Sequence, residues 1–469
     1  MIAGVDLPSK RRIHLVGVAG AGMSALAKLL HQARRPDGEG TWLISGSDLR
    51  AGLDLDALAA IGIETWSGHR PDRMGEMELV VASSAVPEND PELQAAARAG
   101  AIVWRRPDLL WAITAAVPTI GATGTHGKTT TTALLTLLMQ ALGFDPSFVI
   151  GGEMTDLGTN AHYGADPLFV LEVDEAFGTF ERTRLAGLVV TNVEPEHLDY
   201  FGTAGKMEAA FERVARSVKG PVLACADDEG SRRLAKATGA TTYGLSKEAD
   251  WQIESLQTGA GSVDFELRSP QGMAYPVHVP QPGRHLASNA AGALALVGEL
   301  GYDPEHASRG LTRFRGVKRR FELRGWVGGV TIIDDYAHHP TEVSATVAAG
   351  RLRLGSRPGS LVALFQPHLY SRTEALHREF GVALAAADLA IVTDVYGSRE
   401  SPVPGVTGEL ISTAVAEAGG EVVYVPHRAE VVDVVAQLLH SGDLLLIMGA
   451  GDITHVAGEI AEQLARPAR

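Results

Sequence analysis

The sequence contains very little cysteine and no long apolar run. Cys225 is its single cysteine among 469 residues, which excludes a disulfide within the chain and is typical of a reducing compartment. No stretch of about 18 uninterrupted apolar residues is available to span a membrane. The first residues also lack the apolar core of a signal peptide. We therefore expect a cytoplasmic protein with no membrane partner.

Basic residues are also in the minority. Lys and Arg number 41 and Asp and Glu number 56, so the formal net charge is −15. This balance argues against a nucleic-acid-binding surface, and we expect no nucleic acid partner. An anionic ligand must then be met by a local group of basic side chains and backbone N–H groups. The 53 glycines allow the backbone to approach phosphate closely, which directs attention to glycine loops between strands and helices.

Strand and helix patterns alternate along almost the whole chain. This alternation predicts α/β domains with parallel sheets covered by helices. The length of 469 residues suggests about three domains, which we place at residues 1–112, 113–319 and 320–469. Buried strands are expected at residues 13–16, 168–171, 188–191, 330–333, 361–365 and 444–448, antiparallel strands within 251–279, and helices at 23–31, 129–142 and 287–300.

The most specific local pattern is the segment GTHGKTT at residues 124–130. It follows a predicted strand and opens a predicted helix, so its backbone N–H groups can surround a triphosphate. Lys128 can neutralise the outer phosphates, and the hydroxyl of Thr129 or Thr130 can reach Mg²⁺. The first glycine of the generic phosphate-loop pattern is replaced by Ala122, so the match is to the variant GTxGKT. A chance turn is the less favoured alternative, because strand and helix lie in the required places.

Carboxylates and a histidine follow two further predicted strands. Glu172 lies at the end of the strand at 168–171, with Asp174 and Glu175 directly after it, and His197 comes after the strand at 188–191. Neighbouring strand ends of a parallel sheet lie close together, so Glu172 and His197 are predicted to share a cation with the phosphate loop. Taken singly, each of these residues would be assigned to an ordinary solvated loop.

A second glycine loop, GVAGAG at residues 17–22, joins the first predicted strand to its helix. It can admit a diphosphate at the helix N-terminus, and Asp48 after the next strand can hydrogen-bond a ribose or a uracil. A glycine turn that only permits tight packing is equally compatible with this pattern. A dinucleotide-dependent oxidoreductase built on this loop is a rival of another class, although the dinucleotide spacing GxGxxG is absent. Trp42, Trp66 and Trp104 are expected in the core.

Together these motifs resemble the Mur ligase family over nearly the whole chain and in the same order. The segments that carry the resemblance are residues 124–130, Glu172 with Asp174 and Glu175, residues 191–194 (TNVE) and 197–199, residues 282–285 with Asn289, and residues 316–322 and 334–342. The resemblance implies a Rossmann-like N-terminal domain for a UDP-sugar and a central P-loop ATPase-type domain with a mixed sheet. It also implies a Rossmann-like C-terminal domain that closes over an amino acid.

The resemblance also implies roles for individual residues. ATP would be bound by Gly124, Thr125, His126, Gly127, Lys128, Thr129, Thr130, Asn289, Arg320 and Asp335, and Mg²⁺ by Thr129 or Thr130, Glu172 and His197. The UDP-sugar would contact Gly20, Ala21, Gly22, Asp48, Ser84 and Arg106. The catalytic residues would be Lys128, His197, His339 and Arg372. ATP and Mg²⁺ are thus the expected cofactors, and the expected assembly is a monomer or a weak homodimer.

Within the family, three regions are most similar to the members that add L-alanine to UDP-N-acetylmuramic acid. These regions are residues 20–24, residues 45–48, and residues 365–368 with 370–373. Two positions depart from the family pattern: Ala176-Phe177 replaces a serine and an aspartate, and Leu369 replaces an arginine, leaving Arg372 as the nearer cation for the amino acid. A ligase that attaches a preformed peptide and a non-catalytic UDP-sugar-binding paralogue are the alternatives.

Overall fold

The computed structural model describes residues 12–33, 40–49, 51–398 and 400–465. These residues form three sheets and divide into two compact units. The first unit holds the described residues up to 255 together with 265–278 and 288–314, and the second holds 256–264, 279–287 and the described residues from 315 onward. Within the described residues, no helix is both long and apolar enough to cross a membrane.

The first sheet has five strands in the order β3-β2-β1-β4-β5, and its pairs are parallel. Its strands are β1 (Arg12–Val16), β2 (Leu43–Asp48), β3 (Glu64–Ser67), β4 (Leu79–Ala82) and β5 (Ile102–Arg105), and its helices are α1 (Ala21–Gln32), α2 (Leu53–Ala60), η1 (Pro71–Glu76), α3 (Pro91–Ala99) and α4 (Arg106–Ala116). From β1 the chain first adds β2 and β3 on one side of the sheet and then β4 and β5 on the other. This switch creates a crevice for ligands at the carboxyl edge between β1 and β4. The prediction of a Rossmann-like domain is confirmed.

The second sheet has ten strands in the order β15-β14-β13-β12-β11-β10-β6-β9-β7-β8. Its strands are β6 (Thr119–Thr123), β7 (Ser147–Met154), β8 (Thr159–His162), β9 (Phe169–Glu172), β10 (Gly187–Val190), β11 (Val222–Cys225), β12 (Thr241–Gly244), β13 (Trp251–Thr258), β14 (Val263–Arg268) and β15 (Ala274–Val279). Its helices are α5 (Lys128–Ala141), η2 (Ala176–Arg182), α6 (Leu198–Phe201), α7 (Ala204–Ser217), α8 (Glu229–Thr238), α9 (Arg284–Glu299), α10 (Pro304–Ser308) and η3 (Arg309–Arg313). The sheet is mixed, as predicted, because β7 and β8 are antiparallel whereas β6 is parallel to both β9 and β10.

The first two sheets share one apolar core. Buried side chains of β1 and α1, such as Leu15 and Leu26, belong to the same cluster as Phe169 of β9 and Leu188 of β10. A polar contact joins the same elements, since Lys28 Nζ donates a hydrogen bond of 2.8 Å to Asn160 Oδ1 on β8. This continuous burial places the first glycine loop and the phosphate loop in one compact unit.

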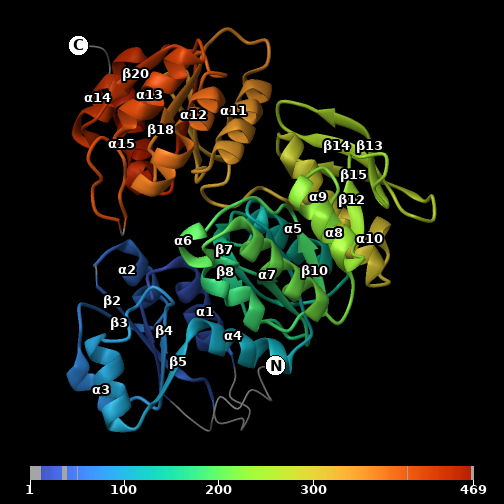
Figure 1. Ribbon diagram of the computed structural model, residues 1–469, viewed down its shortest axis with the longest axis vertical. Coiled ribbons are helices and arrows are strands. Elements are labelled where there is room, and N and C mark those ends of the chain that lie inside the picture. Colours follow the sequence, from blue (N-terminus) through green and yellow to red (C-terminus); the bar gives the residue numbers. More distant parts are fainter. Residues whose placement is uncertain (1–11, 34–39, 50, 399, 466–469) are drawn as a thin grey trace. The chain divides into compact units, whose positions relative to one another are not determined.

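The second unit contains a six-stranded sheet in the order β16-β17-β21-β18-β19-β20, with helices on both faces (Figure 1). Its strands are β16 (Glu322–Val327), β17 (Val330–Asp335), β18 (Leu361–Phe365), β19 (Leu389–Thr393), β20 (Val422–Val425) and β21 (Leu444–Met448). Helices α11 (Pro340–Leu354), α12 (Tyr370–Leu384) and α13 (Gly408–Glu417) pack on one face, and α14 (Arg428–Leu438), η4 (Asp452–His455) and α15 (Val456–Leu464) on the other. Only the β16–β17 pair is antiparallel among the strand pairs of this sheet in the described chain.

Candidate active site

The predicted phosphate loop connects β6 to the N-terminus of α5. Gly124 and Gly127 adopt φ angles of 129° and 82°, which side chains rarely permit. A Cβ atom on Gly124 would overlap Thr191 Oγ1, and one on Gly127 would lie 2.8 Å from Asn289 Oδ1. The loop therefore needs glycine at both positions, and Gly127 lies beside Asn289, a predicted ATP-binding residue. Because the first N–H groups of a helix have no partner within the helix, the start of α5 is suited to a phosphate.

The segment after β10 holds the phosphate loop in this conformation. His126 N donates to Asn192 Oδ1 at 2.8 Å, and Asn192 Nδ2 donates back to His126 O at 3.2 Å. Thr191 Oγ1 donates to the same carbonyl at 2.5 Å, and Glu194 N donates to Thr125 Oγ1 at 2.9 Å. Residues 191–194 carry part of the family resemblance, but their sequence pattern predicts no role for them. Their role depends on the pairing of β10 with β6, which local pattern does not reveal.

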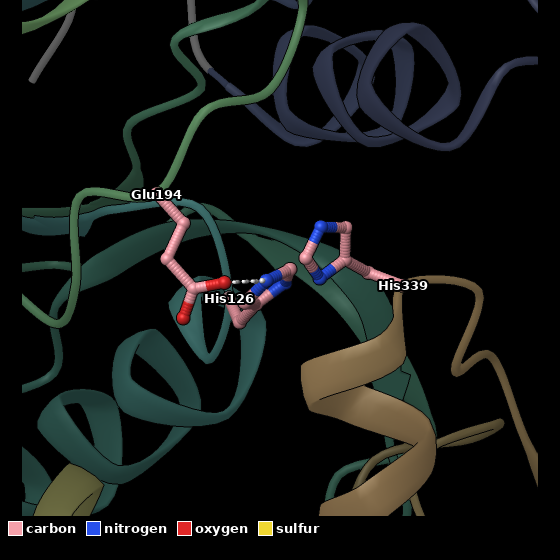
Figure 2. Close-up of side chains that lie close together, drawn as sticks. All are labelled: His126, Glu194 and His339. Carbon is pink, nitrogen blue, oxygen red and sulfur yellow. Dashed lines mark ion pairs between the residues drawn. The ribbon is translucent and has the colours of Figure 1, made fainter. Parts of the chain in front are cut away.

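The side chain of His126 also faces this segment. Its Nε2 lies 3.5 Å from Glu194 Oε2, and Figure 2 shows the two groups directed at each other from the loop and from the end of β10. The histidine is 8% exposed. His126 occupies the variable position of the GTxGKT pattern. Its backbone and its imidazole both contact the segment that follows β10.

Lys128 is held within the loop by oxygen atoms. Its Nζ donates to Gly124 O at 2.7 Å, to Thr125 O at 3.1 Å and to Glu175 Oε1 at 2.8 Å. Burial disfavours the ammonium, but the attraction of Glu175 and Asp174 outweighs it and raises the pKa of Lys128. Burial also raises the pKa of Glu175 to about 7, against the attraction of Lys128. The loop therefore carries a permanent cation whose partner is a carboxyl group that ionises near neutrality.

The predicted metal ligands are only partly brought together. Thr129 Oγ1 donates to Glu172 Oε1 at 3.0 Å, and Gly151 N donates to Glu172 Oε2 at 2.6 Å. His197 lies instead against Glu175, with its Nε2 3.7 Å from Oε1. Of the two predicted threonines, the structure thus brings Thr129 to the carboxylate. The hydroxyl and carboxylate oxygens are the donors that Mg²⁺ prefers, so this part of the set fits the ion.

The predicted UDP-sugar residues gather at the carboxyl edge of the first sheet. Gly20 precedes α1, and Asp48 Oδ2 accepts a hydrogen bond of 3.2 Å from Ala19 N in the glycine loop. A Cβ on Gly22 would lie 2.9 Å from Arg106 Cζ, so the guanidinium covers the start of α1. Arg106 Nη1 is also 3.4 Å from Asp174 Oδ2 of the central domain.

Two polar atoms near this glycine loop are buried and have no hydrogen-bond partner among the described residues. They are Ser84 Oγ and Arg106 Nε. Buried polar groups are normally hydrogen-bonded, so each unsatisfied atom needs an explanation. A bound ligand with phosphate or hydroxyl oxygens would satisfy both atoms. This supports a ligand site over the alternative of a turn that only permits packing.

In the second unit, the predicted residues follow β17 and β18. The carboxylate of Asp335 accepts hydrogen bonds from Ala337 N at 2.7 Å and Phe321 N at 2.8 Å. Burial raises its pKa to about 6, although the attraction of Arg320 opposes the shift. His339 directly precedes α11 and is 8% exposed. Arg372, in the first turn of α12, has its Nη1 3.5 Å from His368 Nδ1.

Backbone strain is concentrated in the predicted motifs. Four residues of these motifs other than glycine have positive φ angles: His197 at 53°, Arg319 at 59°, Phe321 at 51° and Leu369 at 72°. Such conformations cost on the order of 1–3 kcal/mol each and are often retained for function. Leu369 is notable because it is also the position where the sequence departs from the family pattern. This backbone conformation is therefore compatible with a leucine side chain.

Comparison with protein families gives matches over most of the chain. The Mur ligase family catalytic domain matches residues 12–117, the Mur ligase middle domain matches residues 122–297, and the Mur ligase glutamate ligase domain matches residues 319–451. These three ranges contain the glycine loop, the phosphate loop and the strand ends of the second unit, respectively.

Individual relatives are similar over nearly their full length. The UDP-N-acetylmuramate–L-alanine ligase of Kineococcus radiotolerans is 43% identical, covering 97% of this chain and 96% of the relative. That of Mycolicibacterium smegmatis is 40% identical, covering 99% and 97%. The crystal structure of UDP-N-acetylmuramate-alanine ligase from Thermotoga maritima has a TM-score of 0.82 at 27% identity, covering 96% of this chain and 98% of that one.

The Asn192→Ala variant tests whether the end of β10 shapes the phosphate loop. It removes both hydrogen bonds to the backbone of His126, and a misplaced loop is expected to weaken ATP binding about tenfold or more. Isothermal titration with ATP measures the effect. Asn89→Ala, in an exposed loop of the same unit, is the control and should bind as the wild type does. Unchanged affinity in Asn192→Ala would contradict the assignment.

The Glu175→Gln variant tests the buried carboxyl group through pH dependence. The pKa of Glu175 is raised from 4.5 to about 7, so its stabilising contribution is fully present below pH 4.5 and is lost as the pH rises through 7. The free energy of unfolding of the wild type, relative to Glu175→Gln, should fall by on the order of 2 kcal/mol between about pH 5 and pH 8. Urea denaturation at several pH values measures this difference. A difference in the free energy of unfolding that does not change with pH would contradict the raised pKa of Glu175.

Leu369→Gly is expected to relieve the strained backbone. Leu369→Ala is its matched control, because the alanine keeps the Cβ atom that a φ of 72° disfavours. We expect the glycine variant to be more stable than the alanine variant by about 1 kcal/mol. Thermal denaturation compares the stability of the two variants. An alanine variant as stable as the glycine variant, or more stable, would show that the backbone at residue 369 is unstrained.

Proposed function

This chain belongs to the Mur ligase family, and from that premise we propose that it joins L-alanine to the lactyl carboxylate of UDP-N-acetylmuramic acid at the expense of ATP. The observation that carries the proposal is 43% identity, across 97% of the chain, with a relative named for this reaction. The reaction is a step in the synthesis of peptidoglycan precursors. The phosphate loop and the glycine loop of the first unit supply separate places for the two nucleotides.

The chemistry explains why ATP is needed. A carboxylate is a poor electrophile because it has no good leaving group. An oxygen of the lactyl carboxylate attacks the γ-phosphorus of ATP, which releases ADP and forms an acyl phosphate. The amine of L-alanine then attacks the carbonyl carbon to give a tetrahedral intermediate. Collapse of this intermediate releases inorganic phosphate, loses a proton from nitrogen and leaves the amide bond.

The residues of the first unit are arranged to reduce charge repulsion in the first step. An anionic carboxylate must approach an anionic triphosphate, and the permanent cation of Lys128 among the loop N–H groups offsets that repulsion. Thr129 and Glu172 would hold Mg²⁺. The family resemblance adds His197 as a further ligand, which would have to leave its contact with Glu175. When bound, Mg²⁺ neutralises phosphate oxygens and assists the leaving of ADP. The unsatisfied atoms of Ser84 and Arg106 would bind the UDP-sugar.

Roles in the second unit follow from the family and remain predictions. We infer that Arg372 binds the carboxylate of L-alanine, since Leu369 offers no charge at the position of the family's arginine. Arg320, Asp335 and His339 are assigned to the nucleotide and the transferred phosphate. We further propose a monomer or weak homodimer that works in the cytoplasm, where the nucleotide substrates and a reducing environment are found.

The decisive assay is ATP-dependent phosphate release with UDP-N-acetylmuramic acid and one acceptor at a time. L-alanine should give saturable release, glycine and L-serine should give less, and omission of any substrate should abolish it. Release with a tripeptide but not with L-alanine would identify a peptide-adding ligase instead. Binding of UDP-N-acetylmuramic acid without any release would identify a non-catalytic paralogue.

Lys128→Ala tests the phosphate loop in the same assay. Loss of the cation at the triphosphate should lower kcat/KM for ATP by about a thousandfold. Lys236→Ala, on the exposed surface of α8, is the matched control and should retain full activity. Near-normal turnover of Lys128→Ala would refute the role of the loop.

A further inference from the structure

Glu92 is a buried carboxylate outside the sites described above. It lies in the first turn of α3 and is 1% exposed. Its Oε2 accepts a hydrogen bond from Ser47 Oγ at 2.6 Å. Its Oε1 accepts from Trp66 Nε1 at 2.9 Å and from Arg70 N at 2.8 Å. One carboxylate thus joins the end of β2, β3 and the loop that follows β3.

A buried histidine completes the network. His14 of β1 has its Nδ1 3.0 Å from Ser45 Oγ and its Nε2 3.1 Å from Ser47 Oγ. Its ring stacks on Trp66 at 4.5 Å, with an interplanar angle of 5°. Burial disfavours the charged form of Glu92, yet nearby His14, whose Nε2 lies 3.8 Å from Glu92 Oε2, and the hydrogen bonds from Ser47, Arg70 N and Trp66 outweigh it and lower the pKa of Glu92 to about 2.

A buried ion of this kind is a poor source of stability. Removing a carboxylate from water costs several kcal/mol, and well-packed apolar side chains often stabilise a core as well or better. Fully satisfied polar networks do, however, fix one arrangement of the groups that they join. The position of the segments that Glu92 joins therefore indicates its role.

These segments form the carboxyl edge of the first sheet, where the UDP-sugar residues lie. The carbonyl of Ser47 accepts hydrogen bonds from Gly17 N at 2.8 Å and Val18 N at 3.0 Å, at the start of the glycine loop. The carbonyl of Asp48 accepts from Gly68 N at 2.8 Å. The carboxylate therefore holds the loop at residues 68–70 directly and the glycine loop through β2.

We propose that Glu92 is a positioning residue for the UDP-sugar: it fixes the glycine loop and the loop at residues 68–70 relative to each other. The proposal rests on the proposed function, because it needs UDP-N-acetylmuramic acid as the ligand of this edge. Glu92 does not touch the substrate. It acts through the backbone of the two loops, so its loss should affect one substrate and spare the others.

The test compares Glu92→Ala with Glu92→Gln in the full-length enzyme. The alanine variant loses every accepted hydrogen bond, and its KM for UDP-N-acetylmuramic acid should rise about tenfold or more. Its kcat and its KM values for ATP and L-alanine should stay within about twofold of the wild type. In the glutamine variant, the amide oxygen still accepts from Trp66 Nε1 and Arg70 N, so the rise should be limited to about threefold. Glu88→Ala, exposed before α3, is the control and should match the wild type.

Circular dichroism first establishes that each variant is folded. If Glu92→Ala does not fold, Glu92→Gln and Trp66→Phe decide, because Trp66→Phe removes one donor to Glu92 and should raise the same KM two- to fivefold. An unchanged KM for UDP-N-acetylmuramic acid, or an equal rise of KM for all three substrates, would overturn the positioning role. Ligation by the wild type would in that case leave the proposed function intact. A wild type that neither binds nor ligates UDP-N-acetylmuramic acid would overturn both.

Discussion

The parallel pairing of β6 with β9 on one side and β10 on the other is the constraint on which the active site depends. This arrangement places three strand ends at one edge of a sheet. The end of β6 leads into the phosphate loop, the end of β9 supplies Glu172, and the segment after β10 supplies the groups that hold the phosphate loop. Carboxyl ends of parallel strands are general places for ligands because helix N-termini and loops meet there. The predicted phosphate-loop residues and Glu172 lie at that edge.

Buried charge is used in two different ways in the first unit. At Lys128 and Glu175, burial raises the pKa of the carboxyl group to about 7, so the site keeps a cation whose partner is easily neutralised. At Glu92, three hydrogen-bond donors and the nearby His14 lower the pKa to about 2, so the carboxylate is ionised at neutral pH. The first arrangement fits the phosphate-binding role that we propose for Lys128. The second arrangement fits the role that we propose for Glu92, which is to hold the glycine loop and the loop at residues 68–70 in place.

Departures from the family pattern are informative because the structure shows what surrounds them. Leu369 keeps a strained backbone although the family's arginine is absent, and Arg372 lies near His368 one helical turn later. Arg372 belongs to the family-like segment 370–373 and supplies a cation in the first turn of α12. The positive φ angle at residue 369 is therefore compatible with a leucine side chain.

The sequence by itself determined the features that are local along the chain. Continuous apolar runs identified the buried strands β17, β18 and β21, and the spacing of Gly124, Gly127 and Lys128 identified the phosphate loop. Only the tertiary structure decided that Asn192 holds His126, 66 residues away, that His197 lies beside Glu175, and that Glu92 joins the ends of two strands. The physical reason is that strand order and register bring these groups together, and apolar periodicity specifies which residues are buried without specifying which strands are neighbours.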